Sequence, residues 1–381
     1  MRPVWAEVDL DAITANAATL KAVAAPAALC AVVKADGYGH GAAAAARAAL
    51  AGGAEVLAVA LASEGAELRA AGIDATVLVL SQASPGEVDQ LVASGLDATV
   101  YTPAGVRGLA EAAARAGRGA ADPVGVHLKV DTGMHRVGVA PEEAVALAQA
   151  VAGDPVLALR SVFTHCAVAD EPDNAFTTVQ LERFRGVLAE LRAAGISVPC
   201  AHAANTAAAL DHPDARLDLV RCGIGVYGIA PAPALAGRVA LQPALSLRAQ
   251  VSHVKRVAAG EGISYGHRYR PARETTIATV PLGYADGLPR RLGSVGGEVL
   301  VGGVRRPIAG SVTMDQILVD CGDDPVGVGD EVVLLGHQGD EEIGAERWAE
   351  LLGTIAYEIV CGISLRVPRR YVHRAGTGGP S

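Results

Sequence analysis

The feature that most constrains this fold is a regular alternation of short apolar runs and alanine-rich segments between residues 28 and about 225. Eight runs are typical of buried strands: ALCAVVK (28–34), EVLAVA (55–60), TVLVL (76–80), DATV (97–100), VGVHLKV (124–130), VLALRSVFTH (156–165), VPCAHA (198–203) and LDLVRC (217–222). The segments between them, such as GHGAAAAARAALAGG, have helical composition and end in glycine. The pattern predicts an α/β fold, a (β/α)8 barrel of TIM type, with an open doubly wound sheet as the alternative.

The alternation of apolar runs and alanine-rich segments ends near residue 235. PAPALAG at 231–237 is predicted to be a linker, and the β-type runs beyond it are separated by glycine turns. One helical piece, GAERWAELLGTIAYEIVCGI, lies near the end. We therefore expect a barrel domain over residues 1–235 and a mostly β C-terminal domain over 236–381. The first strand, in PVWAEVDL, could pair with either domain, and the tail GTGGPS is expected to be disordered.

The bulk composition narrows the class of protein. Hydrophobic residues make up 51% of the chain and charged residues 19%, which suits a large folded core. A net charge of −9 argues against nucleic acid as a partner, because a phosphate backbone needs a basic surface. No signal peptide or membrane-spanning run is visible, and six scattered cysteines fit buried apolar positions better than disulfides or a metal site. These features predict a cytoplasmic protein with no metal and no membrane partner.

Lysine is scarce, and its few positions point to chemistry. Of the 32 basic residues only Lys21, Lys34, Lys129 and Lys255 are lysines. Arginine serves wherever a positive charge suffices, whereas only an amine that can lose its proton forms a Schiff base or a carbamate. Lys34 ends the first predicted barrel strand, where barrels carry their active residues. A strand-end lysine that merely reaches solvent is the structural alternative.

The last predicted barrel strand leads into VRCGIGVYG. Glycines at 223 and 225 allow backbone N–H groups to approach a phosphate, and barrels often bind phosphate after their seventh and eighth strands. Glycine pairs are common in a chain with 45 glycines, so this signal is weak alone. Arg221, just before them, is either a surface arginine or a partner for an anion or a ring nitrogen.

These residues carry a resemblance to the bacterial alanine racemases. AVVKADGYGHG is similar to the lysine signature of that family, and further similar segments follow in the family's order from WAEVDLDAI to RVPRRYV: KVDTGMHRVG, SVFTHCAVAD, HAANTAAAL, RCGIGVYG, ISYGHRY, PLGYADGLPR, SVTMDQ and TIAYEIVCGIS. One such match is weak, but a full set in register over nearly the whole chain is specific. The family's fold, a barrel followed by a β domain, agrees with the pattern of strands and helices.

The resemblance implies a pyridoxal-phosphate-dependent isomerase with two bases. Lys34 would hold the cofactor as a Schiff base and move the α-proton on the D-alanine face, and Tyr265 would be the base on the L-alanine face. Two bases are needed because a single base returns the proton to the face it left. The implied reaction interconverts L-alanine and D-alanine through an external aldimine and supplies D-alanine for peptidoglycan. Tyrosine normally titrates near pH 10, so Tyr265 would need nearby cations.

The resemblance also implies the residues that hold the cofactor and substrate. Arg221 would face the pyridine nitrogen and His165 would lie near the ring. The phosphate contacts would be Tyr38, Thr206, Gly223, Ile224 and Tyr357. Arg136 and the backbone N–H of Met314 would position the substrate carboxylate. Lys129 is carbamylated in some relatives, which leaves open an anion paired with the neighbouring arginine. Thr206 stands where serine is usual, a conservative difference.

Tyr265 lies beyond the predicted linker, so its meeting with Lys34 needs an explanation. In the resembled family a head-to-tail homodimer solves this, because each β domain completes the partner's site. Two alternatives stay open: a serine or broad-specificity racemase of the same fold (or a decarboxylase), and a non-catalytic pyridoxal-phosphate-binding homeostasis protein. Proteins of the latter kind tend to consist of the barrel alone, so the β domain argues against it.

Overall fold

The computed structural model describes residues 2–374, so the tail GTGGPS falls outside the described residues. The chain forms two compact units, Ile13–Gln242 and a second unit that combines the described residues up to Ala12 with those from Pro243 onward. No helix of residues 2–374 is long and apolar enough to cross a membrane.

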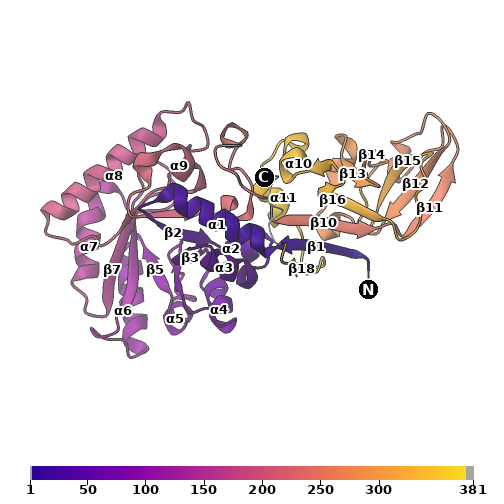
Figure 1. Ribbon diagram of the computed structural model, residues 1–381. Coiled ribbons are helices and arrows are strands. Elements are labelled where there is room, and N and C mark those ends of the chain that lie inside the picture. Colours follow the sequence, from indigo (N-terminus) through magenta and orange to yellow (C-terminus); the bar gives the residue numbers. More distant parts are fainter. Residues whose placement is uncertain (1, 375–381) are drawn as a thin grey trace. The chain divides into compact units, whose positions relative to one another are not determined.

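The first unit is built on eight parallel strands surrounded by helices (Figure 1). The strands are β2 (Ala28–Val32), β3 (Val56–Val59), β4 (Thr76–Val79), β5 (Asp97–Val100), β6 (Val124–Lys129), β7 (Leu157–Phe163), β8 (Ala201–His202) and β9 (Leu219–Cys222). The helices are α1 (Leu10–Ala24), α3 (Ala42–Ala51), α4 (Ala62–Ala70), α5 (Val88–Ala93), α6 (Pro103–Arg115), α7 (Ala144–Ala152), α8 (Phe176–Ala193) and α9 (Thr206–Asp211).

The strands follow chain order around the sheet, and the first strand, β2, pairs with the last, β9. The segments around β8 and β9 are joined by two backbone hydrogen bonds, from Asp218 to the carbonyl of Ala201 (3.0 Å) and from Arg221 to that of Ala204 (2.9 Å). A doubly wound sheet would instead place its first strand inside the sheet. The predicted (β/α)8 barrel is therefore confirmed.

Small aliphatic side chains make up much of the barrel core. Strands β3 and β4 each bury three of their four residues, as expected of parallel strands covered on both faces. Helix α3 buries four alanines against its neighbours, and Gly52 at its end is so close to α1 that a Cβ there would lie 2.3 Å from the Thr14 carbonyl oxygen. Alanine and glycine thus allow close helix packing in a chain with few aromatic residues.

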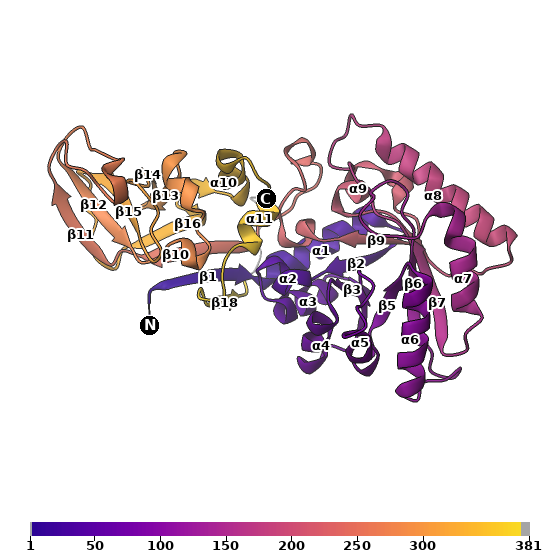
Figure 2. The same ribbon diagram turned by 180° about the vertical axis from the view of Figure 1, so that it is seen from behind.

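The second unit is mostly β, as predicted (Figure 2). Its larger sheet has the order β14-β13-β16-β10-β1-β18, with β17 paired to β16, and its smaller sheet has the order β11-β12-β15. The strands are β1 (Val4–Asp9), β10 (Leu245–Gln250), β11 (His253–Val257), β12 (Thr275–Val280), β13 (Glu298–Val301), β14 (Val304–Pro307), β15 (Ile317–Gly322), β16 (Glu331–Gln338), β17 (Glu341–Ile343) and β18 (Arg369–Val372). Helices α10 (Ala345–Leu352) and α11 (Ala356–Cys361) follow β17.

The opening strand belongs to this second unit. Strand β1 pairs antiparallel with β10 and parallel with β18, which resolves the choice that the sequence left open. The single run LSLRAQVSHVKRV forms two strands in two different sheets, β10 and β11. The division falls between two consecutive amides: Val251 donates to the carbonyl of Asp330, and Ser252 donates to that of Thr279.

Candidate active site

Lys34 begins an unusual turn at the end of the first barrel strand. The predicted strand extended to Lys34, but β2 ends at Val32, and Lys34–Tyr38 forms the short element α2. Ala35 and Asp36 both have φ 51°, and Tyr38 has φ 53°. Each non-glycine residue in this left-handed region costs about 1–2 kcal/mol. Such a conformation persists only where its surroundings hold it, and it concentrates at functional sites.

Two carboxylates hold this left-handed turn. Glu64 on α4 accepts a hydrogen bond from the Ala35 amide (2.7 Å) and also accepts the amides of Ala60 and Leu61. Asp36 accepts the Ala42 amide at 2.8 Å. The backbone beside Lys34 is therefore tied both to the start of α4 and to the start of α3.

Arg221 is buried at the end of β9, with 3% of its surface exposed. Its Nη2 donates to the carbonyl oxygens of Thr164 (2.8 Å) and Ala203 (2.9 Å), and its Nη1 donates to His202 Nδ1 (2.8 Å). Nη2 also lies 3.3 Å from His165 Nδ1. These contacts use Nη1 and Nη2, so the guanidinium plane is fixed while Nε remains for a further acceptor.

The neighbouring side chains make this end of the barrel electropositive. Lys129 is the last residue of β6; burial and the charges of Arg221, Arg136 and Lys34 lower the pKa of Lys129 to about 8. Burial, followed by the charge of Arg221, also holds the pKa of His165 well below its usual value. An anionic ligand relieves repulsion among buried cations. The predicted residues of the barrel unit thus gather where an anion binds favourably, with Arg136 exposed on the loop after β6.

The predicted phosphate contacts of the barrel lie against Gly223. A Cβ at this position would be 2.4 Å from the Tyr38 hydroxyl oxygen, so a larger residue here would displace that hydroxyl. The Gly223 amide donates to Thr206 Oγ1 at 3.0 Å, and Ile224 begins the next turn. Tyr38, Thr206 and the Gly223 backbone therefore converge between β2, α9 and β9. Two hydroxyls and backbone amides beside buried cations match what a phosphate group requires.

The other predicted site residues lie in the second unit. Tyr265 is 74% exposed and Met314 52% exposed, which is unusual for large apolar side chains. Their loops are tied together, because Ser311 Oγ donates to the Tyr265 carbonyl (3.2 Å) and Ser264 Oγ to the Ser311 carbonyl (2.9 Å). Tyr357 is half-buried on α11. The structure thus brings Tyr265 and the Met314 segment together within the β unit.

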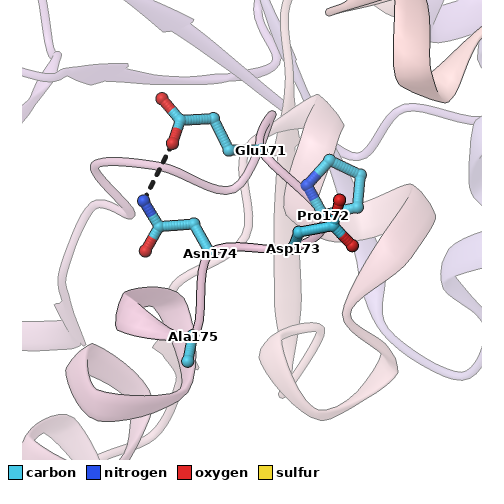
Figure 3. Close-up of a pocket in the computed structure, with 5 residues that line it drawn as sticks. All are labelled: Glu171, Pro172, Asp173, Asn174 and Ala175. Atoms are coloured by element: carbon cyan, nitrogen blue, oxygen red, sulfur yellow. Dashed lines mark hydrogen bonds between the residues drawn. The ribbon is translucent and has the colours of Figure 1, made fainter.

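A surface pocket in the β7–α8 loop contains none of the predicted site residues. Figure 3 shows its lining, Glu171–Ala175, with the side chains of Glu171 and Asn174 turned toward each other. Asn174 Nδ2 donates to Glu171 Oε2 at 2.8 Å. The Glu171 carboxylate thus accepts from a neighbour in its own loop, and this lining differs from the cationic residues at the barrel end.

Comparisons with known proteins identify the family of this chain. The model of the alanine racemase N-terminal domain matches residues 8–231, and that of the C-terminal domain matches residues 244–371. The chain belongs to the alanine racemase family. The alanine racemase of Symbiobacterium thermophilum is 50% identical over 97% of both chains, and that of Thermobifida fusca is 48% identical over 96% of this chain and 97% of the relative. The crystal structure of the enzyme from the D-cycloserine producer Streptomyces lavendulae superposes with a TM-score of 0.93 at 42% identity over 98% of each chain.

Membership of the alanine racemase family confirms the expected enzyme class, an isomerase that acts on amino acids. Sequence reasoning assigned no role to His202, although it forms a direct contact with Arg221. The available signal was a histidine inside an apolar strand run, VPCAHA, where a polar side chain needs a buried partner. The same signal is present in VGVHLKV, which contains His127.

Proposed function

We propose that this protein interconverts L-alanine and D-alanine with pyridoxal phosphate as cofactor, and so supplies D-alanine for peptidoglycan. The observation that carries the proposal is the convergence of Lys34, Arg221 and the Gly223 cradle at one end of the barrel. An amine that can form a Schiff base, a buried cation and a phosphate-sized donor set are the three features that this cofactor needs. The cytoplasmic location stays a prediction.

The donor set of the barrel end fits the cofactor. The Tyr38 and Thr206 hydroxyls with the backbone at Gly223 and Ile224 would hold its phosphate, and Tyr357 would add a hydroxyl from the β unit. Arg221 would donate Nε–H to the ring nitrogen, since Nη1 and Nη2 are used by His202 and two carbonyls. His165, with a lowered pKa, would stay neutral near the ring and add no further positive charge.

Bound pyridoxal phosphate supplies an electron sink that makes the α-hydrogen of an amino acid acidic. Lys34 then moves the proton at the α-carbon on the D-alanine face. The turn around Lys34 is fixed by Glu64 and Asp36, which keeps its backbone in one place during proton transfer. Arg221 can only donate hydrogen bonds, so beside a bound cofactor it would leave the ring nitrogen unprotonated.

Tyr265 serves as the base on the L-alanine face. Its exposed side chain is free of burial within its own unit, in agreement with a role against another surface. The cations of the barrel end, Arg221 and Arg136, would favour the phenolate form that a base requires. The hydrogen bond from Ser311 Oγ to the Tyr265 carbonyl joins the two loops. The backbone N–H of Met314, three residues after Ser311, would then bind the substrate carboxylate.

Arg136 and Lys129 complete the carboxylate site. Arg136 is exposed at the barrel end and would pair with the substrate carboxylate. Lys129 has a pKa lowered to about 8, so its neutral amine is accessible near physiological pH. This supports carbamylation of Lys129, which would replace a repelling cation beside Arg136 by an attracting anion. A mass increment of one carbon dioxide on this residue tests the modification.

We further propose a homodimer in which each β unit completes the partner's site. The support is the division of the predicted site residues between the two units, together with the exposure of Tyr265 and Met314. Mixing the inactive variants Lys34→Ala and Tyr265→Phe, with dissociation and reassociation, is expected to restore about a quarter of the sites by random pairing. No recovery in a mixture that demonstrably exchanges subunits would contradict trans assembly.

The direct test of the activity is a chiral assay on the purified, cofactor-loaded protein with L-alanine, L-serine and L-lysine. Inversion of alanine well above the other two supports an alanine racemase. Preference for serine, or similar rates for all three, would favour the broad-specificity alternative. Bound cofactor with no inversion of any substrate would favour a homeostasis protein.

A further inference from the structure

We infer that Asp97, His127 and Ser161 are positioning residues for Arg221. Together with His202 they form a series of hydrogen bonds along the barrel wall, from Arg221 to the Asp97 carboxylate. The inference rests on the proposed function, because Arg221 is the residue assigned to the cofactor ring. The five side chains come from five consecutive strands, β5 to β9, with one residue on each.

The contacts form one unbroken series. His202 Nδ1 accepts from Arg221 Nη1 (2.8 Å), and His202 Nε2 lies 2.7 Å from Ser161 Oγ. Ser161 Oγ lies 2.5 Å from His127 Nδ1, and His127 Nε2 lies 3.1 Å from Asp97 Oδ2. The three middle residues are buried, and the Asp97 side chain is 22% exposed.

The two ends fix the direction of every hydrogen bond. Arginine only donates, so His202 Nδ1 must accept and its proton lies on Nε2. That Nε2–H donates to Ser161 Oγ. The buried serine hydroxyl hydrogen also needs an acceptor, and His127 Nδ1, 2.5 Å away, is the acceptor in reach. His127 then carries its proton on Nε2 and donates to Asp97, which is a carboxylate and accepts. Burial and the charge of Arg221, which together lower the pKa of His202, agree with a neutral ring.

Arg221 needs such a connection because it is a buried cation without an adjacent carboxylate among the described residues. Within residues 2–374 no carboxylate lies within ion-pair distance of Arg221. Burial lowers the pKa of Arg221, and the titratable groups that raise it are cysteines, not carboxylates. A buried guanidinium without a counter-charge is costly. A series of hydrogen bonds polarised toward Asp97 distributes that charge, since bonds in a chain strengthen one another in a low dielectric.

Local backbone features are arranged around this series. A register shift between β6 and β7 places Ser161 directly opposite His127, with Leu159 opposite Val126. Such a bulge re-aims a side chain. A Cβ at residue 125 would lie 2.2 Å from Asp97 Oδ1, so Gly125 leaves the space that this carboxylate fills. His202 is also stacked on Phe163, with ring centroids 4.8 Å apart and planes at 1°.

The consequence for Arg221 is a fixed orientation. The carbonyls of Thr164 and Ala203 hold Nη2, and within the described part of the chain the hydrogen bond of Nη1 goes to His202. If His202 reversed its tautomer, Nδ1–H would face Nη1–H and the guanidinium would turn away. The series opposes this reversal, because Ser161 accepts from His202 and donates to His127, and the Asp97 carboxylate accepts the remaining His127 N–H.

A double-mutant cycle on the full-length, cofactor-loaded protein tests this. Ser161→Ala and Asp97→Leu each break the series once, so each should lower kcat by about 10-fold with little change in KM, and the double variant should fall no further. Asp97→Asn keeps an acceptor and should lose less. Thr99→Val is the matched control: Thr99 is buried on β5 opposite His127, but its hydroxyl has no hydrogen-bond partner among residues 2–374.

The second readout is the nitrogen-15 spectrum of the histidine rings, recorded with and without cofactor. In the wild-type protein His202 and His127 should both be neutral with the proton on Nε2. Asp97→Asn should shift the His202 resonances, and the same change in a Ser161→Ala background should leave them unmoved. A proton on His202 Nδ1, a doubly protonated His202, or additive losses of kcat in folded variants would overturn the inference. Failure of the wild type to invert alanine would instead contradict the proposed function, because the ring spectra do not depend on it.

Discussion

The Glu64 carboxylate accepts a hydrogen bond from the Ala35 amide at 2.7 Å, one residue after Lys34. Its second oxygen accepts the amides of Ala60 and Leu61 at the start of α4. A single side chain thus anchors the left-handed turn to α4, the helix that follows β3. Removing the Glu64 carboxylate therefore tests how much this hydrogen bond stabilises the turn.

We expect Glu64→Ala to lower the free energy of unfolding by about 1–2 kcal/mol, because three amides lose a charged acceptor while water partly replaces it. Urea unfolding of the cofactor-loaded protein measures the change. Glu64→Gln retains one acceptor and should lose less. Glu67→Ala, on the exposed face of the same helix, is the control and should have little effect. Equal losses for Glu64→Ala and Glu67→Ala would contradict the anchoring role.

Gly37 tests the strain of the turn itself. It has φ +61°, and a Cβ there would lie 3.3 Å from the Ala42 backbone and the Ala45 side chain. Gly37→Ala should therefore cost about 1–2 kcal/mol for the left-handed backbone and more for the tight contact. Gly72→Ala, at φ +77° with nothing within 4 Å, measures the backbone cost alone. A Gly37→Ala protein as stable as Gly72→Ala would show that the contact has no effect.

Much of the fold, and less of the site, follows from the sequence. All eight barrel strands were predicted from their apolar runs, because parallel strands buried on both faces have a clear composition. The left-handed turn was not, because nothing in Ala35 or Tyr38 signals a positive φ. The break between β10 and β11 was also missed, because it depends on two amides that bind different strands.

The contacts of Arg221 could not be predicted from the sequence either. The pairing of His127 with Ser161 depends on a register shift, and a shift of one residue reverses which side chains share a face. Tyr265 and Met314 were assigned only through the family resemblance, since exposed loop residues carry no periodic signal.

Gly223 tests the phosphate cradle. Gly223→Ala would place a Cβ against the Tyr38 hydroxyl and displace it, so we expect affinity for pyridoxal phosphate to fall at least about 10-fold. Fluorescence titration of cofactor-free protein measures this. Tyr38→Phe should weaken binding similarly, and the double variant no further. Gly108→Ala on α6, where a Cβ meets nothing, is the control. Unchanged affinity in Gly223→Ala would rule out this cradle.

Lys129 gives the protein a pH-dependent stability if its amine is unmodified. The pKa falls from 10.5 to about 8 on folding, chiefly through burial. Between these values the unfolded chain binds more protons, so the free energy of unfolding should rise with pH, by at most roughly 3 kcal/mol. Lys129→Met should abolish the rise, and Lys255→Met, at an exposed position, should keep it. A flat profile in the wild-type protein would instead indicate a carbamylated Lys129.

The central claim is that Lys34 and Tyr265 act on opposite faces of the same α-carbon. Exchange of the α-hydrogen with solvent deuterium, followed by NMR in the Tyr265→Phe protein, tests it most directly. We predict that D-alanine still exchanges, through Lys34, while L-alanine does not and inversion is lost. Exchange of both enantiomers at similar rates, or of neither in a protein with full cofactor content, would contradict it.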